Sequence, residues 1–300
     1  MSINSNILSF LSGYSFDILK INRLIVSIFC DINSIKVDNN KIIKNLIISS
    51  QDSEEYQAFL ELKKEFKNTR QPFFFEELIE LFEFVISPGD KLINGAVYTP
   101  KNIREFIVTD SIKANPDILN STVCDIACGC GGFLYEYAIK LNQKGKCYSD
   151  IIEQNLYGID ITGYSIDRTK ILLSLLAVYN GEDKDNFEFN LFIGNSLEFD
   201  WFVNSKVIET NNGFDYIFGN PPYVGSSNLD NKTKELMKNW SVSLTGKLDL
   251  YIPFFQIGLK WLKDGGILGY ITVNNFYRSL NGRALRKYFS ENEFQFKFID

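Results

Sequence analysis

The sequence predicts an α/β fold, a doubly wound and mainly parallel sheet preceded by a small helical domain. Between residues 91 and 300, short apolar segments that end in Gly, Asp or Asn alternate with helical segments. This alternation is typical of parallel strands joined by crossover helices. Residues 1–90 instead carry apolar residues at helical spacing and no chemical motif. The turn-forming sequence Ser87-Pro88-Gly89-Asp90 marks the expected boundary between the two parts.

Helical segments account for most of residues 1–90. Residues 7–30 show helical spacing, and a second segment from 54 to about 67 carries acids in its first turn. Gln71-Pro72 opens a third segment. Its apolar residues fall on one side: Phe74, Leu78, Leu81, Phe82 and Val85.

The second part begins with Thr99-Pro100, an expected N-cap followed by Pro in the first turn, which predicts a helix to about residue 114. The expected strands are residues 123–127, 155–161, 187–193, 214–218, 267–273 and 294–299. The expected helices are residues 133–141, 165–179, one capped by Asp249, and 284–289. Ligands of such sheets bind at the carboxyl ends of the strands.

The composition narrows the chemistry. The chain contains no histidine, which excludes Ser-His-Asp and Cys-His catalysis, His-ligated zinc and an imidazole base. The net charge is −6, whereas a small nucleic-acid binder that depends on charge alone is usually basic. Contact with nucleic acid would therefore be local or supplied by another part.

The sequence favours a cytoplasmic protein. It has no apolar run of membrane-spanning length, and the first ten residues lack the basic region of a signal peptide. Three of the five cysteines, Cys124, Cys128 and Cys130, lie close together without a C-x-x-C pair. We expect reduced thiols rather than a zinc site, and no metal.

A glycine-rich turn follows the first expected strand, in the sequence Asp125-Ile126-Ala127-Cys128-Gly129-Cys130-Gly131-Gly132-Phe133. Glycine lets the backbone approach a ligand closely. The turn is not the G-x-G-x-x-G dinucleotide fingerprint, and its short glycine segment suits an adenosyl ligand without a pyrophosphate. A purely structural turn is the alternative.

Two more strand ends carry polar side chains. Asp160, at the end of Tyr157-Gly158-Ile159-Asp160, can accept hydrogen bonds from two ribose hydroxyls or can cap the next helix. Asn195, in Gly194-Asn195-Ser196, can bind an adenine edge or form a turn.

The most specific motif is Asn220-Pro221-Pro222-Tyr223, which follows the strand at 214–218. The prolines restrict the loop, so the Asn side-chain oxygen and the Pro221 carbonyl can both accept from one NH₂ group. Such acceptors favour a pyramidal nitrogen whose lone pair faces an electrophile. Tyr223 could stack on a base that has left its duplex. A Pro-Pro turn without chemistry is the alternative.

Residues 94–300 resemble the N6-adenine DNA methyltransferases of restriction–modification systems, especially type I modification subunits and fused type II enzymes. The resemblance rests on the ordered motifs at 95–100, 125–133, 160 and 220–223. It implies a class I methyltransferase fold with S-adenosyl-L-methionine as cofactor. Its implied catalytic residues are Asn220, Pro221, Pro222 and Tyr223.

The same resemblance implies a cofactor site. Tyr98 and Thr99 belong to the opening motif, and the methionine-binding loop supplies Asp125, Ala127, Cys128, Gly129, Gly131 and Phe133. Asp160 corresponds to the ribose-binding acid, with Ile161 against the adenine. Asn195 and Ser196 lie where the family reads the adenine amine, and Phe254 flanks the ring.

The resemblance also implies partners. Double-stranded DNA with a flipped-out adenine would be the substrate. The final strand and the target-recognition domain of the family have no counterpart in the 300 residues. We therefore expect a separate specificity subunit or a further carboxyl-terminal domain. Basic residues after the motif could contact phosphate or form a solvated face: Lys232, Lys234, Lys238, Lys247, Arg278, Arg283, Arg286 and Lys287.

Two alternatives remain open. Release-factor glutamine methyltransferases use Asn-Pro-Pro-Tyr on a planar amide and also carry a small helical amino-terminal domain. The other alternative is a non-catalytic binding subunit that keeps the fold but has lost turnover.

Overall fold

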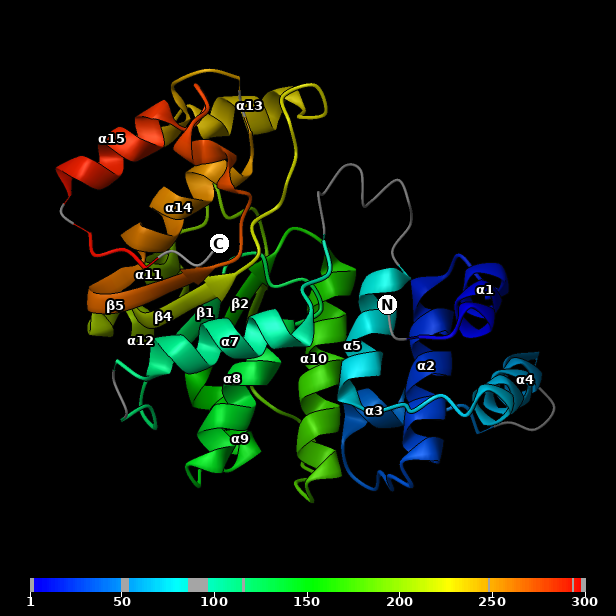
Figure 1. Ribbon diagram of the computed structural model, residues 1–300. Helices are drawn as coiled ribbons and strands as arrows, with labels where there is room; N and C mark the ends of the chain where they lie inside the picture. The colour runs from blue at the N-terminus through cyan, green and yellow to red at the C-terminus, as the bar shows by residue number, and fades with distance from the viewer. Residues whose placement is uncertain are drawn as a thin grey trace.

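The computed structural model describes residues 3–49, 54–85, 97–114, 117–247, 249–292 and 294–297. Within these residues a five-stranded sheet has the order β3-β2-β1-β4-β5, with every neighbouring pair parallel (Figure 1). The strands are β1 (Val123–Asp125), β2 (Leu156–Asp160), β3 (Asn190–Ile193), β4 (Phe214–Gly219) and β5 (Leu262–Tyr270). This doubly wound order confirms the predicted fold class, and the chain reverses direction across the sheet next to β1.

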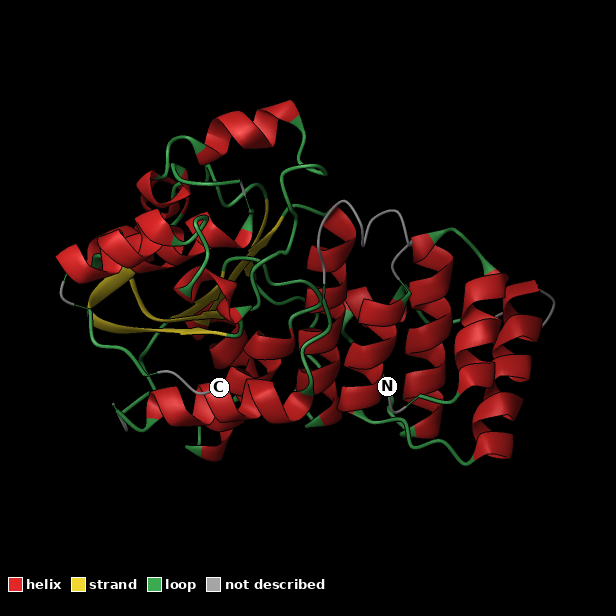
Figure 2. Ribbon diagram, turned by 45° about the horizontal axis from the view of Figure 1, so that its top comes forward, coloured by secondary structure: helices red, strands yellow, loops and turns green. Residues whose placement is uncertain are grey.

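Alternate strand residues build the two faces of the sheet. Tyr216 and Phe218 of β4 pack in one apolar cluster, whereas Ile217 lies in another on the opposite face. The first face is covered by α7 (Lys101–Ile112), α8 (Gly132–Gln143) and α10 (Gly163–Tyr179), and the second by α11 (Trp201–Asn204), α12 (Lys206–Asn211) and α14 (Tyr251–Lys260). Figure 2 shows the strands between these helical layers.

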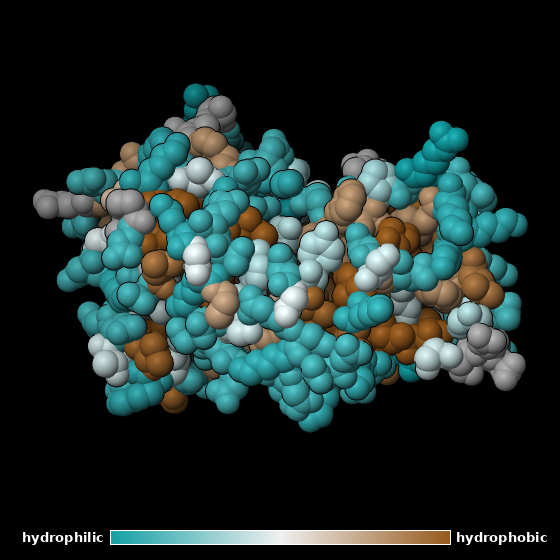
Figure 3. All heavy atoms as spheres, turned by 90° about the horizontal axis from the view of Figure 1, so that it is seen from below, coloured by the Kyte–Doolittle hydropathy of each residue, from teal (hydrophilic) through white to brown (hydrophobic). Residues whose placement is uncertain are grey.

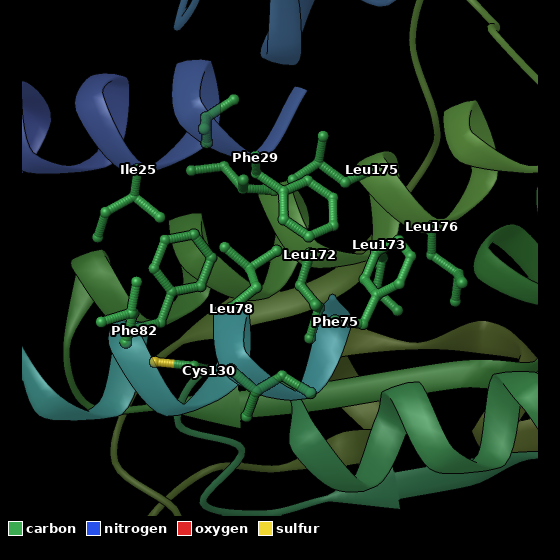
Figure 4. Close-up of a cluster of buried hydrophobic side chains, with 14 of the residues drawn as sticks. Ile25, Phe29, Phe75, Leu78, Phe82, Cys130, Leu172, Leu173, Leu175 and Leu176 are labelled. Carbon is green, nitrogen blue, oxygen red and sulfur yellow. The ribbon is translucent and has the colours of Figure 1, made fainter. Parts of the chain in front are cut away.

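The amino-terminal helices extend one of these layers. They are α1 (Ser5–Tyr14), α2 (Ile18–Ile32), α3 (Lys41–Lys44), α4 (Glu54–Thr69) and α5 (Phe75–Phe84). Helix α5 lies beside α10, with α2 on the other side of α5 (Figure 1), and apolar side chains of all three helices meet in one buried cluster (Figure 4). The apolar core is therefore continuous from the amino-terminal helices to the sheet. The predicted boundary at residues 87–90 lies outside the described residues.

A buried arginine adds polar bonds to this apolar contact. Arg168 of α10 is 0% exposed. Its guanidinium donates to the Phe82 carbonyl at 2.6 Å, to the Val85 carbonyl at 3.2 Å and to Oδ1 of Asn22 at 3.0 Å. Both carbonyls belong to the carboxyl end of α5, so Arg168 fixes that end against the sheet domain.

Several predicted boundaries were wrong. Residues 7–30 form two helices, because the Asp17 side chain accepts from the Leu19 amide and starts a new helix there. The N-cap of α7 is Pro100 and not Thr99, and that of α14 is Leu250 and not Asp249. β3 begins only at Asn190, and β5 begins earlier than predicted because Leu262 already pairs with Phe214.

The carboxyl-terminal region also differs from the prediction. Residues 294–297 form no strand, and 298–300 lie outside the described residues. Phe294 and Phe296 instead pack on Phe289. The remaining elements are α9 (Tyr148–Asp150), η1 (Ile151–Asn155), α13 (Asn231–Met237), η2 (Ser241–Ser243), η3 (Asn274–Tyr277) and α15 (Arg283–Glu291).

The face seen from below is mainly hydrophilic, and hydrophobic residues gather in patches over the amino-terminal helices (Figure 3). In the part of the chain that the structure describes, every helix is too short or too polar to span a bilayer.

Candidate active site

A cavity of about 490 Å³ opens at the carboxyl ends of β1, β2 and β4, within the size range of small-molecule sites. Most of the predicted site residues line it: Tyr98, Thr99, Asp125, Ala127, Cys128, Gly129, Phe133, Asp160, Ile161, Asn195, Ser196, Asn220, Pro222 and Phe254. Gly131, Pro221 and Tyr223 are not among its lining residues. The structure therefore brings the glycine loop and the Asn-Pro-Pro-Tyr motif to one cavity.

The glycine loop has a backbone that only glycine adopts easily. Gly129 and Gly131 have φ values of +52° and +85°. A Cβ on Gly131 would lie 2.8 Å from Cγ2 of Thr169. Gly131 thus lets α8 begin against α10, and the cofactor contact of Gly131 stays a prediction. The Gly129 carbonyl accepts from the Thr169 hydroxyl at 3.0 Å, which fixes the loop further.

Asp160 binds the glycine loop. Its Oδ2 accepts from the Gly129 amide at 2.9 Å, and its Oδ1 accepts from the amide and hydroxyl of Thr162 at 2.9 and 2.8 Å. The N-cap of α10 is Thr162 and not Asp160, so the carboxylate is not a simple cap. Both acceptor positions of Oδ1 are therefore used, and one position on Oδ2 remains for a ligand.

Asp125 is 2% exposed, and its Oδ1 accepts from the Ala127 amide at 3.0 Å. Burial, with Asp160 and Glu83 nearby, raises its pKa to about 8. Burial likewise raises the pKa of Asp160. Buried carboxyls with raised pKa values bind a cation favourably, because a positive charge stabilises their ionised form.

The adenine end of the predicted site is mainly apolar. Ile161 is 56% exposed and Phe254 is 5% exposed, and both line the cavity. The Asn195 side chain accepts from the Leu197 amide at 3.0 Å, the turn that the sequence left open as an alternative. The Ser196 hydroxyl donates to the Ile126 carbonyl. These bonds hold the loop after β3 beside the end of β1.

Asn220 has a fixed amide orientation. Its Nδ2 donates to the Val97 carbonyl and to Oγ1 of Thr99, both at 3.1 Å. Its Oδ1 accepts from the Tyr223 hydroxyl at 2.7 Å. An amide oxygen has two lone pairs, so one acceptor position remains for a substrate amine. Thr99, predicted to be a helix cap, instead positions Asn220.

Tyr223 contacts the amide through its hydroxyl, which also lies 3.1 Å from the Ile271 carbonyl. Its ring lies 6.0 Å from that of Tyr251 and outside the cavity lining. In this structure Tyr223 is therefore a positioning residue for Asn220, and stacking on a base stays a prediction.

Sequence reasoning missed an arginine that holds the opening motif. Arg104 of α7 is buried and donates to the Thr99 carbonyl and, at 2.6 Å, to Oε2 of Glu76. The Tyr98 hydroxyl donates to Oε1 of the same Glu76. Glu76 belongs to α5, so the opening motif is tied to an amino-terminal helix. No local pattern distinguishes these residues from surface charges.

The three clustered thiols are buried and unpaired with one another, and only Cys128 of the three lines the cavity. Cys124, Cys128 and Cys130 are free, and burial raises the pKa of each well above its usual value. Within the described ranges, no group of three or more Cys, Asp or Glu side chains is arranged to hold a metal ion.

The cavity fits S-adenosylmethionine. The cofactor carries an ammonium and a sulfonium charge, ribose hydroxyls and a flat adenine. The buried carboxyls match the cations and hydroxyls, and the apolar surface of Ile161 and Phe254 matches the ring.

Comparison with known proteins identifies the class. Residues 154–300 match the family described as Eco57I restriction-modification methylase. The chain is 30% identical over 273 residues to the type II restriction enzyme and methyltransferase RM.Eco57I of Escherichia coli. This match covers 73% of this chain and 27% of the length of RM.Eco57I. It is 29% identical over 213 residues to the type II methyltransferase M.VspI of a Vibrio species, covering 71% and 45%.

Solved structures share the fold. MmeI, a type IIL restriction–modification enzyme solved with DNA, has a TM-score of 0.62 at 14% identity, over 96% of this chain and 53% of that one. The methyltransferase subunit of a type I system from Streptococcus thermophilus has a TM-score of 0.51 at 17% identity, over 84% and 52%.

The fold is that of the class I S-adenosylmethionine-dependent methyltransferases. Within that class, the chain is related to the DNA methyltransferases of restriction–modification systems, and S-adenosylmethionine is its cofactor. The chain spans 27% to 45% of the length of the first curated relatives that it matches.

Proposed function

We propose that this chain transfers a methyl group from S-adenosylmethionine to the exocyclic N6 amine of adenine in double-stranded DNA, as part of a restriction–modification system. The observation that carries the proposal is the fixed amide of Asn220, which lines the same cavity as the glycine loop and Asp160. The relatives named above, which are DNA methyltransferases, favour DNA over a glutamine amide as substrate.

In this proposal the chain orients the amine and does not remove a proton from it beforehand. Asn220 Oδ1 accepts from one amine hydrogen, and the Pro221 carbonyl accepts from the other. Both acceptors follow the end of β4, so they approach the amine from one side. The bound cofactor supplies an electrophilic methyl group on sulfur. Alignment of the amine with that methyl group then accounts for the rate.

The network around Asn220 makes this orientation rigid. Rotation of the amide would cost the bonds to Val97, Thr99 and Tyr223 at once. The cofactor would be held by Asp125 and Asp160 around the glycine loop, with Ile161 and Phe254 against the adenine.

We further propose that sequence recognition comes from a separate subunit or a further domain. Several basic residues after the motif are already engaged: Lys232 pairs with Glu198, Lys238 with Glu235 and Lys287 with Glu291. Arg286 donates to the carbonyls of Phe276 and Ser279 and shapes a turn. Local phosphate contacts alone would therefore give weak binding.

The test uses labelled S-adenosylmethionine with mixed-sequence double-stranded DNA, and analysis of the nucleosides by mass spectrometry. We expect the unaltered protein to form N6-methyladenine slowly and without sequence preference, because this chain alone would bind DNA weakly. Asn220→Ala should lower the rate about 100-fold or more, because the amine loses an orienting acceptor, while calorimetry still detects cofactor binding. Asn239→Ala, at an exposed asparagine, is the matched control. Unchanged activity in Asn220→Ala, or label in a glutamine peptide and not in DNA, would contradict the proposal.

A further inference from the structure

Glu83 reaches the cavity from outside the sheet domain. It lies near the carboxyl end of α5 and lines the same cavity as Asp125 and Asp160. Its Oε1 accepts from the Cys130 amide at 3.1 Å, and a Cβ on Gly129 would lie 3.0 Å from that oxygen. The half-buried carboxylate thus touches the backbone of the glycine loop on its open side.

Arg168 places Glu83 there. Its guanidinium binds the carbonyls of Phe82 and Val85, the residues on either side of the segment that contains Glu83. The same guanidinium is bound to Asn22 of α2. A buried polar network and the apolar contact between α5 and α10 (Figure 4) therefore hold the backbone that carries Glu83. These contacts fix the position of Glu83 at the cavity.

The carboxyl groups that line the cavity, those of Glu83, Asp125 and Asp160, would be stabilised in their ionised form by a positively charged group of the ligand. Burial raises the pKa of Glu83, and nearby Asp160 raises it further, whereas bonds from Cys130 and the charge of Arg168 lower it. Arg104 also lines the cavity, but it is engaged by Glu76 and the Thr99 carbonyl. Adenosine is neutral and the carboxylate of the methionine tail is negative, so only the ammonium and the sulfonium of the cofactor can supply positive charge.

We propose that Glu83 binds the ammonium group of the methionine tail of S-adenosylmethionine, so that an amino-terminal helix completes the cofactor site. Asp160 is not assigned to the ammonium, because its oxygens bind Gly129 and Thr162 at the end of β2. That end of β2 is the side of the cavity assigned to the ribose. The inference depends on the cofactor part of the proposed function and is independent of the methyl acceptor.

The test is calorimetric titration of the full chain with three ligands. S-Adenosylmethionine carries both cations, S-adenosylhomocysteine keeps only the ammonium, and 5′-methylthioadenosine lacks the whole tail. Glu83→Gln should weaken binding of the first two about 10- to 100-fold, the value of a charge-assisted hydrogen bond. Binding of 5′-methylthioadenosine should change less than about 2-fold, because the neutral adenosine makes no contact with Glu83.

Two variants serve as controls. Glu77→Gln alters a glutamate of the same helix that caps the helix start and is outside the cavity lining, and it should leave all three affinities unchanged. Asp160→Asn should weaken all three ligands together. If Glu83→Gln does not fold, Glu83→Asp keeps the charge on a shorter side chain and should show the same ligand order with a smaller loss.

The outcomes are separable. Equal weakening of all three ligands by Glu83→Gln, or no weakening, would overturn the inference. Weakening of S-adenosylmethionine alone would assign Glu83 to the sulfonium and also overturn it. If the unaltered protein binds none of the ligands, the cofactor site itself fails. If it binds them as expected but methylates no adenine, only the acceptor assignment fails.

Discussion

The carboxyl groups around the glycine loop link the stability of this protein to pH. Asp125, Asp160 and Glu83 all have raised pKa values, each mainly because of burial, and the bonds from backbone amides only partly offset it. Arg168 is the cation near Glu83, and it too is buried. In the absence of a ligand, ionising these carboxyls in the folded protein is therefore unfavourable.

This raised pKa predicts a pH-dependent stability. Because the pKa of Asp125 is about 8 in the folded protein and near 4 when unfolded, its stabilising effect is complete below pH 4 and is lost as pH rises toward 8. Asp160 and Glu83 act in the same direction. Thermal unfolding between pH 5.5 and 7.5 should show a falling Tm without ligand, and Asp125→Asn should reduce the slope.

S-Adenosylmethionine should counteract that loss, since its cations stabilise the ionised carboxyls. The increase in Tm on adding the cofactor should therefore be greater at pH 7.5 than at pH 5.5. A cofactor-induced increase that is larger at pH 5.5 would show that the carboxyls do not face the cations.

Among the elements, the helix pair α5 and α10 contacts both the opening motif and the glycine loop, which the proposed function uses. Helix α10 follows the ribose-side strand β2, while α5 supplies Glu76 to the opening motif and Glu83 to the glycine loop. A movement of α5 against α10 would change both ends of the cavity. The buried Arg168 is the polar bond between the two helices.

Replacing Arg168 by Met should lower the free energy of unfolding by about 3 kcal/mol, because the Phe82 and Val85 carbonyls and the Asn22 amide oxygen lose their donor inside the protein. Urea unfolding measures the change. Lys64→Met, at an exposed lysine of α4, is the control and should change the free energy by less than about 0.5 kcal/mol. A similar small loss in Arg168→Met would contradict the assigned role.

For the whole molecule, the core joins the amino-terminal helices to the sheet. Leu172, Leu173 and Leu176 of α10 lie in the same buried cluster as Ile25 of α2 and Leu78 of α5 (Figure 4). We propose that residues 1–90 and 91–300, although distinct in sequence character, form one cooperative unit. Removal of the first part would expose the apolar side of α10 to water.

This proposal is tested by expressing residues 91–300 alone. We expect aggregation and loss of cofactor binding, measured by size-exclusion chromatography and calorimetry. Co-expression of residues 1–90 as a separate chain should restore a soluble complex, because the apolar surfaces can then meet again. A folded, monomeric 91–300 fragment that binds S-adenosylmethionine with unchanged affinity would show that the two parts are independent domains.

The strand-end motifs could be read from the sequence because their information is local. Asp125, Asp160 and Asn220 each follow a short apolar strand, and parallel strands bring their carboxyl ends to one edge. Boundaries were predicted less well. The split at Asp17 depends on one side-chain bond, and the early start of β5 depends on pairing with β4 across an irregular register.

The sequence by itself determined the first five strands, most of the helices between them, the glycine turn and the Asn-Pro-Pro-Tyr motif, since each depends on residues a few positions apart. Only the tertiary structure decided that Glu76 binds Arg104 and that Glu83 lines the cavity. It also decided that Thr99 and Tyr223 orient Asn220 and that Arg168 is buried. On a helix, a glutamate at a surface and one in a cavity have the same local pattern. Their difference in burial, pKa and ligand comes from which other helix packs beside them.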